Sequence, residues 1–316
     1  MLKTRIFFTT DIHGSEICFR KFLGAADFYG ADIIMCSGDL TGKLMVPLVQ
    51  RADGSYIVRW PVEREVKTPK ELEQVEASIS NSGYYPLRTN PQEMQELGRD
   101  KAKETQVMNR LMLERMQQWC DFADVFLKDK RVRCYISPGN DDMWEIDPIL
   151  NRSRFVLNHD NKVVEIDGAR EMITLGYSNP TPWDLPRDIT EEQLADKMDA
   201  LASQVKDVKN SIFNVHVPPY KSGLDTAPEL DEDLRTKMYD GNVLMVPVGS
   251  TAVRAAIEKY QPLLGLHGHI HECKAAVKIG RTLCINGGSE YGEGILRGTI
   301  INLDDKGLRS YQFVAG

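Results

Sequence analysis

Residues 6–14 read IFFTTDIHG, an apolar run that ends in Asp11 and His13. The same arrangement, a short apolar run followed by polar residues, recurs further along the chain. The later runs are residues 33–36 before Asp39, 132–136 before Asn140, 212–215 before His216 and 263–266 before His267. Continuous runs of this length that are rich in Ile, Val and Phe are typical of strands buried on both faces. The repeated pattern therefore predicts strands that end in polar residues.

Helical patterns separate several of these runs. Thr190 is followed by Glu-Glu-Gln, which predicts a capped helix start, and Leu194 and Met198 follow at helical spacing. Strands that alternate with helices indicate an α/β architecture, in which ligands bind beyond the carboxyl ends of the strands. From Phe155 onward the sequence is richer in short strand-like runs, which predicts a second sheet packed on the first.

Residues 43–118 interrupt this alternation and are expected to be an insertion in one domain that spans residues 1–316. Two β-like runs around Asp53-Gly54 predict a hairpin. Prolines at 69, 86 and 91 are expected to mark loops, and a single helix is predicted over about residues 91–127. No linker is long enough to demand an independent domain, so the insertion is expected to be a lid or a dimerisation element, and a homo-oligomer stays open.

The composition limits the classes of partner. The chain has 316 residues, a net charge of −7 and 42% hydrophobic residues, which is enough for a large buried core. Because the charge is negative and no Lys/Arg block is present, nucleic acid and anionic membranes are disfavoured as partners. No stretch is apolar enough to span a bilayer or to act as a secretory signal, and the six scattered cysteines are expected to be buried free thiols. These features predict a cytoplasmic protein.

The polar residues at the predicted strand ends are of the types that hold hard divalent metals. Asp11 and His13 are two residues apart, so a strand end can aim both to one side. Gly38 frees the backbone for a sharp turn before Asp39. Each of these pieces is weak alone, but most of the histidines lie at or beside the same strand ends as the carboxylates. The ordered set predicts one metal site.

The set resembles the calcineurin-like metallophosphoesterase superfamily, whose pattern is D-x-H, GD, GN, a single His and GHxH. Here it reads DIH, GD, GNDD, H and GHIH over residues 11–271. The resemblance implies a four-layer αββα sandwich of two mixed β-sheets flanked by helices. It also implies two divalent metals, whose identity among Mn, Fe, Zn, Ni and Mg stays open. The implied ligands are Asp11, His13 and His271 for the first metal, Asn140, His216 and His269 for the second, and Asp39 as the bridge.

Asp141 departs from the pattern, because many relatives have His directly after GN. A carboxylate that faces a phosphate is repulsive unless it is protonated or metal-bound. Asp141 is therefore either the catalytic acid or a loop carboxylate that caps backbone amides, and both interpretations stay open. Relatives without this His tend to be phosphodiesterases, which favours a phosphodiester over a phosphomonoester as substrate.

Other residues have competing interpretations. His267 either orients a metal ligand or is a buried, hydrogen-bonded strand residue. His159 lies in a turn-like sequence and is expected at the surface. The Gly-Ser stretch after Asn286 either supports the metal loops or is a flexible turn. Trp183 either lines the substrate cleft or anchors an exposed loop.

The function implied by the resemblance is a metal-dependent phosphoric ester hydrolase, in which metal-bound hydroxide attacks the phosphorus of a small phosphate ester. A nuclease of the same superfamily is an alternative, which the net charge disfavours. A protein-binding scaffold without catalysis is another, but such relatives typically lose ligand residues, and here all seven positions are filled. The residues after Asp39 and the GNDD sequence do not fit a protein Ser/Thr phosphatase.

Overall fold

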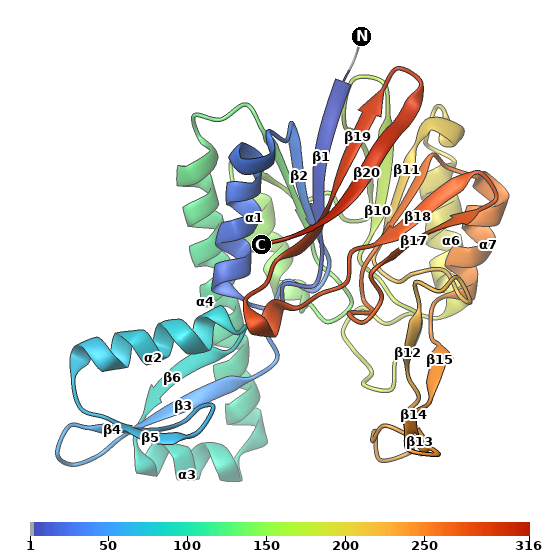
Figure 1. The fold of residues 1–316 in the computed structure, drawn as a ribbon. Helices are drawn as coiled ribbons and strands as arrows, with labels where there is room; N and C mark the ends of the chain where they lie inside the picture. Colours follow the sequence, from blue (N-terminus) through green and yellow to red (C-terminus); the bar gives the residue numbers. More distant parts are fainter. Residues whose placement is uncertain (1–2) are drawn as a thin grey trace.

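The computed structural model describes residues 3–316, which contain two six-stranded sheets (Figure 1). The first sheet has the order β20-β19-β1-β2-β7-β8. Its strands are β1 (Lys3–Thr9), β2 (Ile33–Ser37), β7 (Arg133–Ser137), β8 (Val156–Leu157), β19 (Arg297–Asp304) and β20 (Gly307–Ala315). β1, β2 and β7 run parallel and β19 runs antiparallel to β1, so the sheet is mixed.

The second sheet has the order β17-β18-β16-β11-β10-β9 and is mixed as well. Its strands are β9 (Lys162–Glu165), β10 (Glu171–Leu175), β11 (Ile212–Val215), β16 (Leu264–His267), β17 (Ala275–Ile279) and β18 (Thr282–Asn286). Ile6 and Met35 of the first sheet share one buried apolar cluster with Ile212 and Leu266 of the second. The two sheets are therefore packed face to face, as the strand-rich second half of the sequence predicts.

Helices cover both outer faces of this pair of sheets (Figure 1). α1 (Glu16–Tyr29), α5 (Asp147–Arg152) and the second half of α4 (Lys101–Leu127) pack on the first sheet, where Trp119 stacks on Phe19 with ring centroids 4.2 Å apart. α6 (Glu191–Ala202) and α7 (Thr251–Tyr260) pack on the second sheet. Thr190 and Gln193 form the expected capping box of α6. The fold is the four-layer αββα sandwich that the resemblance implies.

The insertion forms a small unit beside this sandwich (Figure 1). Its four-stranded sheet has the order β5-β4-β3-β6 and buries its own cluster, which includes Leu48, Val58 and Ile79. The elements are β3 (Met45–Gln50), β4 (Tyr56–Arg59), β5 (Glu63–Val66), α2 (Pro69–Asn81), β6 (Tyr85–Thr89) and α3 (Pro91–Arg99). β3 and β4 pair antiparallel on either side of Asp53-Gly54, so the predicted hairpin is confirmed.

Two expectations for the insertion are wrong. The prolines do not mark loops, because Pro69 and Pro91 are the first residues of α2 and α3, where the missing N–H costs nothing, and Pro86 lies in the edge strand β6. The single helix over residues 91–127 is two helices. The chain leaves the helical conformation at Asp100, whose φ is −121° and whose side chain accepts a hydrogen bond from the N–H of Lys103 to begin α4.

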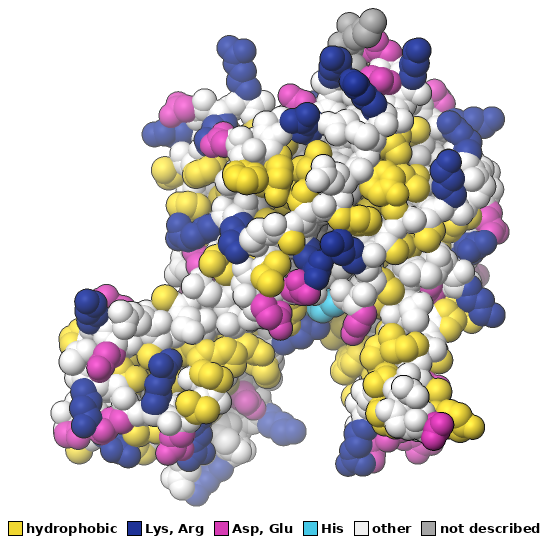
Figure 2. Space-filling model, viewed as in Figure 1, with side chains coloured by type: hydrophobic (Ala, Val, Ile, Leu, Met, Phe, Trp, Pro, Cys, Tyr) yellow, Lys and Arg dark blue, Asp and Glu magenta, His cyan; other side chains and the backbone are white. Residues whose placement is uncertain are grey.

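An arm of two successive two-stranded sheets, which the sequence did not suggest, projects from the other side of the molecule (Figure 1). Its strands are β12 (Thr226–Pro228), β13 (Met238–Tyr239), β14 (Asn242–Val243) and β15 (Met245–Pro247). The arm and the insertion stand on either side of a gap below the sandwich (Figure 2). The carboxyl end of β1 points toward this gap, because β1 begins at the opposite end of the body (Figure 1).

The remaining described elements are short 3-10 helices at Trp144–Ile146, Val208–Asn210 and Tyr291–Glu293. Across residues 3–316, no helix combines the length and the apolar character that crossing a membrane requires. The six cysteines, which all lie in this range, are buried free thiols, as expected.

Candidate metal centre

The side chains predicted to bind metal come from five different strand ends. Asp11 and His13 follow β1, Asp39 follows β2 and Asn140 follows β7 in the first sheet. His216 follows β11, and His269 and His271 follow β16, in the second sheet. The structure brings all seven together at the floor of the gap between the insertion and the arm, where Figure 2 shows a histidine side chain at the surface.

The first group consists of Asp11, His13 and His271, whose ligand atoms all lie within 4.8 Å of one another. Nε2 of His13 is 3.0 Å from Nε2 of His271, and the latter is 3.6 Å from Oδ1 of Asp11. Two imidazole nitrogens and a carboxylate oxygen that converge in this way form the kind of set that holds a divalent cation.

The second group consists of His216, His269 and Asn140 together with Asp39. Nε2 of His216 is 3.3 Å from Oδ1 of Asp39, and Nδ1 of His269 is 3.0 Å from Oδ1 of Asn140. Asp39 reaches the first group as well, because its Oδ2 is 3.5 Å from Nε2 of His13. One carboxylate thus lies between the two groups, at the position that the resemblance gives to a bridging ligand.

Sharp backbone turns aim these side chains. Asp11, Asp39 and His269 have positive φ angles of 53°, 48° and 68°, which non-glycine residues rarely adopt. The glycine before Asp39 is required for a further reason, because a Cβ on Gly38 would lie 1.9 Å from Nδ1 of His216. The strained backbone angles and the close packing of Gly38 against His216 are therefore found in the loops of the site, not in the strands that precede them.

The charges of the site are buried and only partly compensated. Burial lowers the pKa of His13 to about 3 and that of His269 to about 4, so both imidazoles are neutral with a free lone pair. Burial would also lower the pKa of His216, but the carboxylates of Asp39 and Asp11 raise it to about 9. In the chain alone, one proton on His216 therefore offsets part of the charge of the two carboxylates.

The donor set fits two divalent cations. Neither ring nitrogen of His216 has a hydrogen-bond partner among residues 3–316, although both are buried. Buried polar atoms are normally paired, so a buried imidazole beside two carboxylates calls for a further partner. Cations would supply that partner and also balance Asp11 and Asp39.

The two aspartates after Asn140 have different partners. The Asp142 carboxylate is buried and accepts hydrogen bonds from the backbone N–H groups of Gly139, Leu40 and Thr41 and from the Thr41 hydroxyl. The capping role that the sequence left open for Asp141 is thus performed by Asp142. Asp141 instead places Oδ2 2.9 Å from Nζ of Lys43 and 3.8 Å from Nδ1 of His13. Burial and the charge of Asp39 raise the pKa of Asp141 to about 6.

Sequence reasoning missed Lys43, Tyr291 and Asp188. The Tyr291 ring centroid is 4.7 Å from that of His13, and Asp188 accepts a hydrogen bond from the Asn140 amide at 2.8 Å. Tyr291 and Asp188 reach the site from distant segments, and Lys43, four residues after Asp39, belongs to no recognised motif.

The Gly-Ser stretch after Asn286 supports the metal loops, which is one of its two interpretations. The Asn286 amide donates to the carbonyl oxygens of Gly268 and Ile270, and the Ser289 hydroxyl donates to the carbonyl of Asp11 at 2.6 Å. The stretch thereby ties the turn after β16 to the turn after β1.

The other two histidines lie beside the site rather than in it. The Nδ1 atom of His267 is 2.8 Å from the carbonyl of Val215, so the residue is a buried strand histidine that holds the backbone next to His216. The surface position expected for His159 is wrong, because the side chain is fully buried and its Nε2 is 3.2 Å from the Asn214 amide. Trp183 is 56% exposed, and both of its interpretations stay open.

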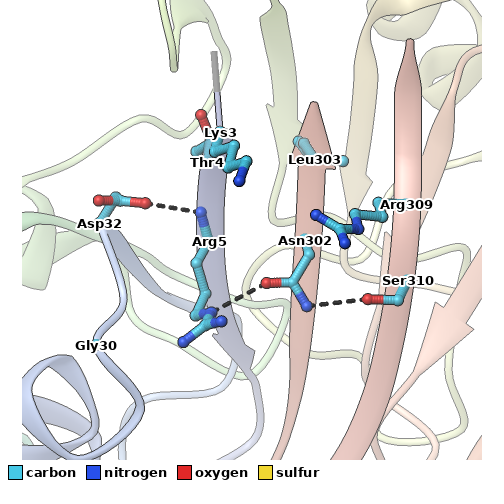
Figure 3. Close-up of a pocket in the computed structure, with 9 residues that line it drawn as sticks. All are labelled: Lys3, Thr4, Arg5, Gly30, Asp32, Asn302, Leu303, Arg309 and Ser310. Atoms are coloured by element: carbon cyan, nitrogen blue, oxygen red, sulfur yellow. Dashed lines mark hydrogen bonds between the residues drawn. The ribbon is translucent and has the colours of Figure 1, made fainter. Parts of the chain in front are cut away.

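A separate concavity of about 580 Å³ lies at the opposite end of β1 (Figure 3). Several of its polar groups pair with one another or with the backbone. The Arg5 side chain donates to Asn302 at 3.0 Å and to the carbonyl of Tyr29 at 2.8 Å, and Asp32 accepts from the Arg5 backbone. No histidine lines it, and among residues 3–316 the groups of side chains that could hold a metal ion lie at the carboxyl ends of the strands.

Comparison with known proteins gives a distant sequence relative and several structural ones. No family model matches the chain. An uncharacterized protein of Methanocaldococcus jannaschii, MJ1162, is 32% identical over 177 residues, which cover 55% of this chain and 68% of that protein. The crystal structure of TT1561 of Thermus thermophilus has a TM-score of 0.55 at 14% identity and covers 100% of this chain and 99% of its own. A dimetal phosphatase of Danio rerio has a TM-score of 0.47 at 9% identity, with 99% and 98% covered.

Proposed function

The chain belongs to the family of the Methanocaldococcus jannaschii protein MJ1162, and from this premise and the geometry of its site we propose that it is a dinuclear metal-dependent phosphoesterase. The observation that carries the proposal is the position of Asp39, whose two oxygens face His13 on one side and His216 on the other. A carboxylate shared by two clusters of donors is what a pair of adjacent cations needs.

Each group of donors would hold one divalent cation. Asp11, His13 and His271 would hold the first, Asn140, His216 and His269 the second, and Asp39 would contact both. When bound, the two cations would supply Lewis acidity at the phosphate and a water of lowered pKa for attack on phosphorus. Mixed oxygen and nitrogen donors accept Mn²⁺ and its neighbours in the series, so manganese is the first ion to test.

Asp141 and Lys43 are the residues of the chain that we expect to contact the ester. Lys43 places its ammonium beside the Asp141 carboxylate, which offsets the repulsion that this carboxylate would exert on a phosphate. We propose that Asp141 is the acid that protonates the leaving group. It occupies the position after Asn140 where many metallophosphoesterases carry His.

The proposed substrate is a small phosphate ester, with a diester favoured over a monoester. The departure at Asp141 supports the diester, and the net charge of −7 supports a small anion rather than a nucleic acid or a membrane surface. We also propose a cytoplasmic site of action, which the six buried free thiols support. The role of the insertion as a lid or a dimerisation element stays a prediction.

The test combines metal analysis with hydrolysis. Purified protein should bind two Mn²⁺ per chain and hydrolyse bis-p-nitrophenyl phosphate faster than p-nitrophenyl phosphate, and chelator should abolish both binding and activity. Asn140→Ala should lose activity, whereas Asn242→Ala, at the tip of the arm, is the matched control. Metal-loaded protein that is inert on a panel of mono- and diesters, with Asn140→Ala indistinguishable from wild type in metal content, would refute the proposal. A scaffold protein would give that result.

A further inference from the structure

Asn140 is the one amide among the proposed ligands, and an amide can face a cation in two ways. Its oxygen can bind a metal and its nitrogen cannot, although the two ends have nearly the same shape. Asn140 is fully buried, so its orientation is set by the protein and not by water.

Asp188 determines this orientation. Nδ2 of Asn140 donates to Oδ1 of Asp188 at 2.8 Å, and Oδ1 of Asn140 lies on the side of His269. An ionised carboxylate only accepts hydrogen bonds, so the nitrogen of the amide must face Asp188 and the oxygen must face the second group of donors.

The other oxygen of Asp188 holds its own loop. Oδ2 accepts from the backbone N–H and the hydroxyl of Thr181 and from the N–H of Leu185. The two oxygens of Asp188 therefore have different partners. Oδ2 stabilises the loop that carries Asp188, and Oδ1 contacts Asn140.

Arg187 fixes the distance between this loop and Asn140. Its backbone N–H donates to the Asn140 carbonyl at 3.1 Å, and its Nε donates to the Asp142 carbonyl at 2.9 Å. Its side chain is fully buried, and Nη2 donates to Asp147 at 2.8 Å. Asp188 is thus held against Asn140 by its neighbour in sequence.

We propose that Asp188 is a positioning residue that selects the metal-binding orientation of the Asn140 amide and so determines the affinity for the second metal. This inference rests on the proposed function. The charge of Asp188 also polarises the amide, which makes the oxygen a better donor to a cation. Partners of this kind typically change metal affinity by about 10- to 100-fold when they are removed.

The first experiment is a calorimetric titration of metal-free protein with Mn²⁺. Asp188→Asn replaces an acceptor with a group that can donate or accept, so the Asn140 amide is free to flip. The second Mn²⁺ should bind about 10- to 100-fold more weakly, with the first unchanged. Thr181→Val removes one bond to Oδ2 but leaves Oδ1 on Asn140, so this matched control should bind both ions like wild type.

The second experiment exchanges the amide of Asn140 and the carboxylate of Asp188 between the two positions. Asn140→Asp alone sets two carboxylates against each other, whereas Asn140→Asp with Asp188→Asn restores one donor and one acceptor. The double variant should bind the second Mn²⁺ more tightly than either single variant. The inference is overturned if Asp188→Asn binds both ions like wild type, or if the double variant is no better than the single ones. Wild-type protein that binds no second ion would refute the proposed function instead, which separates the two failures.

Discussion

Lys43 places its ammonium 2.9 Å from Oδ2 of Asp141, at the edge of the metal centre. Lys43 stands at the start of the insertion, just before β3, while Asp141 follows the strand end of β7. The first residues of the insertion thus place the Lys43 ammonium at the site. The Lys43 side chain is 48% exposed, so it lies where an incoming anion can reach it.

Lys43→Met should weaken phosphate binding, because it removes the cation and leaves the Asp141 carboxylate facing the substrate. We expect KM for bis-p-nitrophenyl phosphate and the inhibition constant of inorganic phosphate to rise about tenfold, equivalent to ~1.4 kcal/mol. Lys43→Arg should retain most of the affinity. Lys67→Met, which removes a cation paired with Glu65 elsewhere on the insertion, is the matched control. Equal inhibition constants for Lys43→Met and Lys67→Met would exclude a phosphate contact.

Asp142→Ala should destabilise the fold far more than Asp141→Ala. The Asp142 carboxylate satisfies three backbone N–H groups and one hydroxyl, all buried, and each stranded donor costs about 1–3 kcal/mol. We expect a loss of at least about 3 kcal/mol in the free energy of unfolding, measured by urea denaturation of metal-free protein. Asp141→Ala should cost less than about 1 kcal/mol. Similar losses for the two variants would mean that Asp141 shares the capping role.

The contrast between these two aspartates shows where prediction from sequence ends. The five apolar runs were recognisable as strands because strands buried on both faces are continuously apolar, and their carboxyl ends meet for topological reasons. The seven converging side chains followed from that placement. Which of Asp141 and Asp142 faces the site depends on the turn at Gly139, where the alternation of a strand no longer applies.

Two of the missed residues, Tyr291 and Asp188, are joined to the site by tertiary packing alone. Asp188 contacts Asn140 across 48 residues, and no periodic pattern signals such a pair. Pro69 taken alone indicates a loop, although the same residue fits the first turn of a helix once Thr68 is seen as its cap. The turn around His159 was recognisable, but turn chemistry does not say whether a turn is buried.

Gly38→Ala should disrupt the metal centre. The new Cβ would lie 1.9 Å from Nδ1 of His216, at a residue whose φ is 103°. We expect loss of the second Mn²⁺ in a calorimetric titration, together with a lower melting temperature. Gly24→Ala is the control, because nothing lies within 4 Å of its Cβ in α1 and the helix should gain about 0.5–1 kcal/mol. Retention of two ions by Gly38→Ala would show that His216 can move without loss of the site.

His159 should make the stability of the metal-free protein fall in mild acid. Its Nε2 is 3.2 Å from the Asn214 amide, its Nδ1 is 3.3 Å from the Leu157 carbonyl, and burial lowers its pKa to about 4. The unfolded chain has the ordinary value of about 6.5. As the pH falls from 6.5 to 4, the unfolded chain therefore binds a proton that the folded chain does not, and stability decreases by up to about 3 kcal/mol.

His159→Gln keeps an acceptor for Asn214 but cannot titrate, so it isolates this contribution. We expect the variant to be about 1 kcal/mol less stable than wild type at pH 7.5 and to lose less stability between pH 6.5 and 4. The measurement is urea denaturation at several pH values with chelator present, so that metal binding does not contribute. The other buried histidines titrate equally in both proteins and cancel in the difference. Parallel stability curves for the variant and wild type would show that His159 is protonated in the folded state, which its contact with a donor amide argues against.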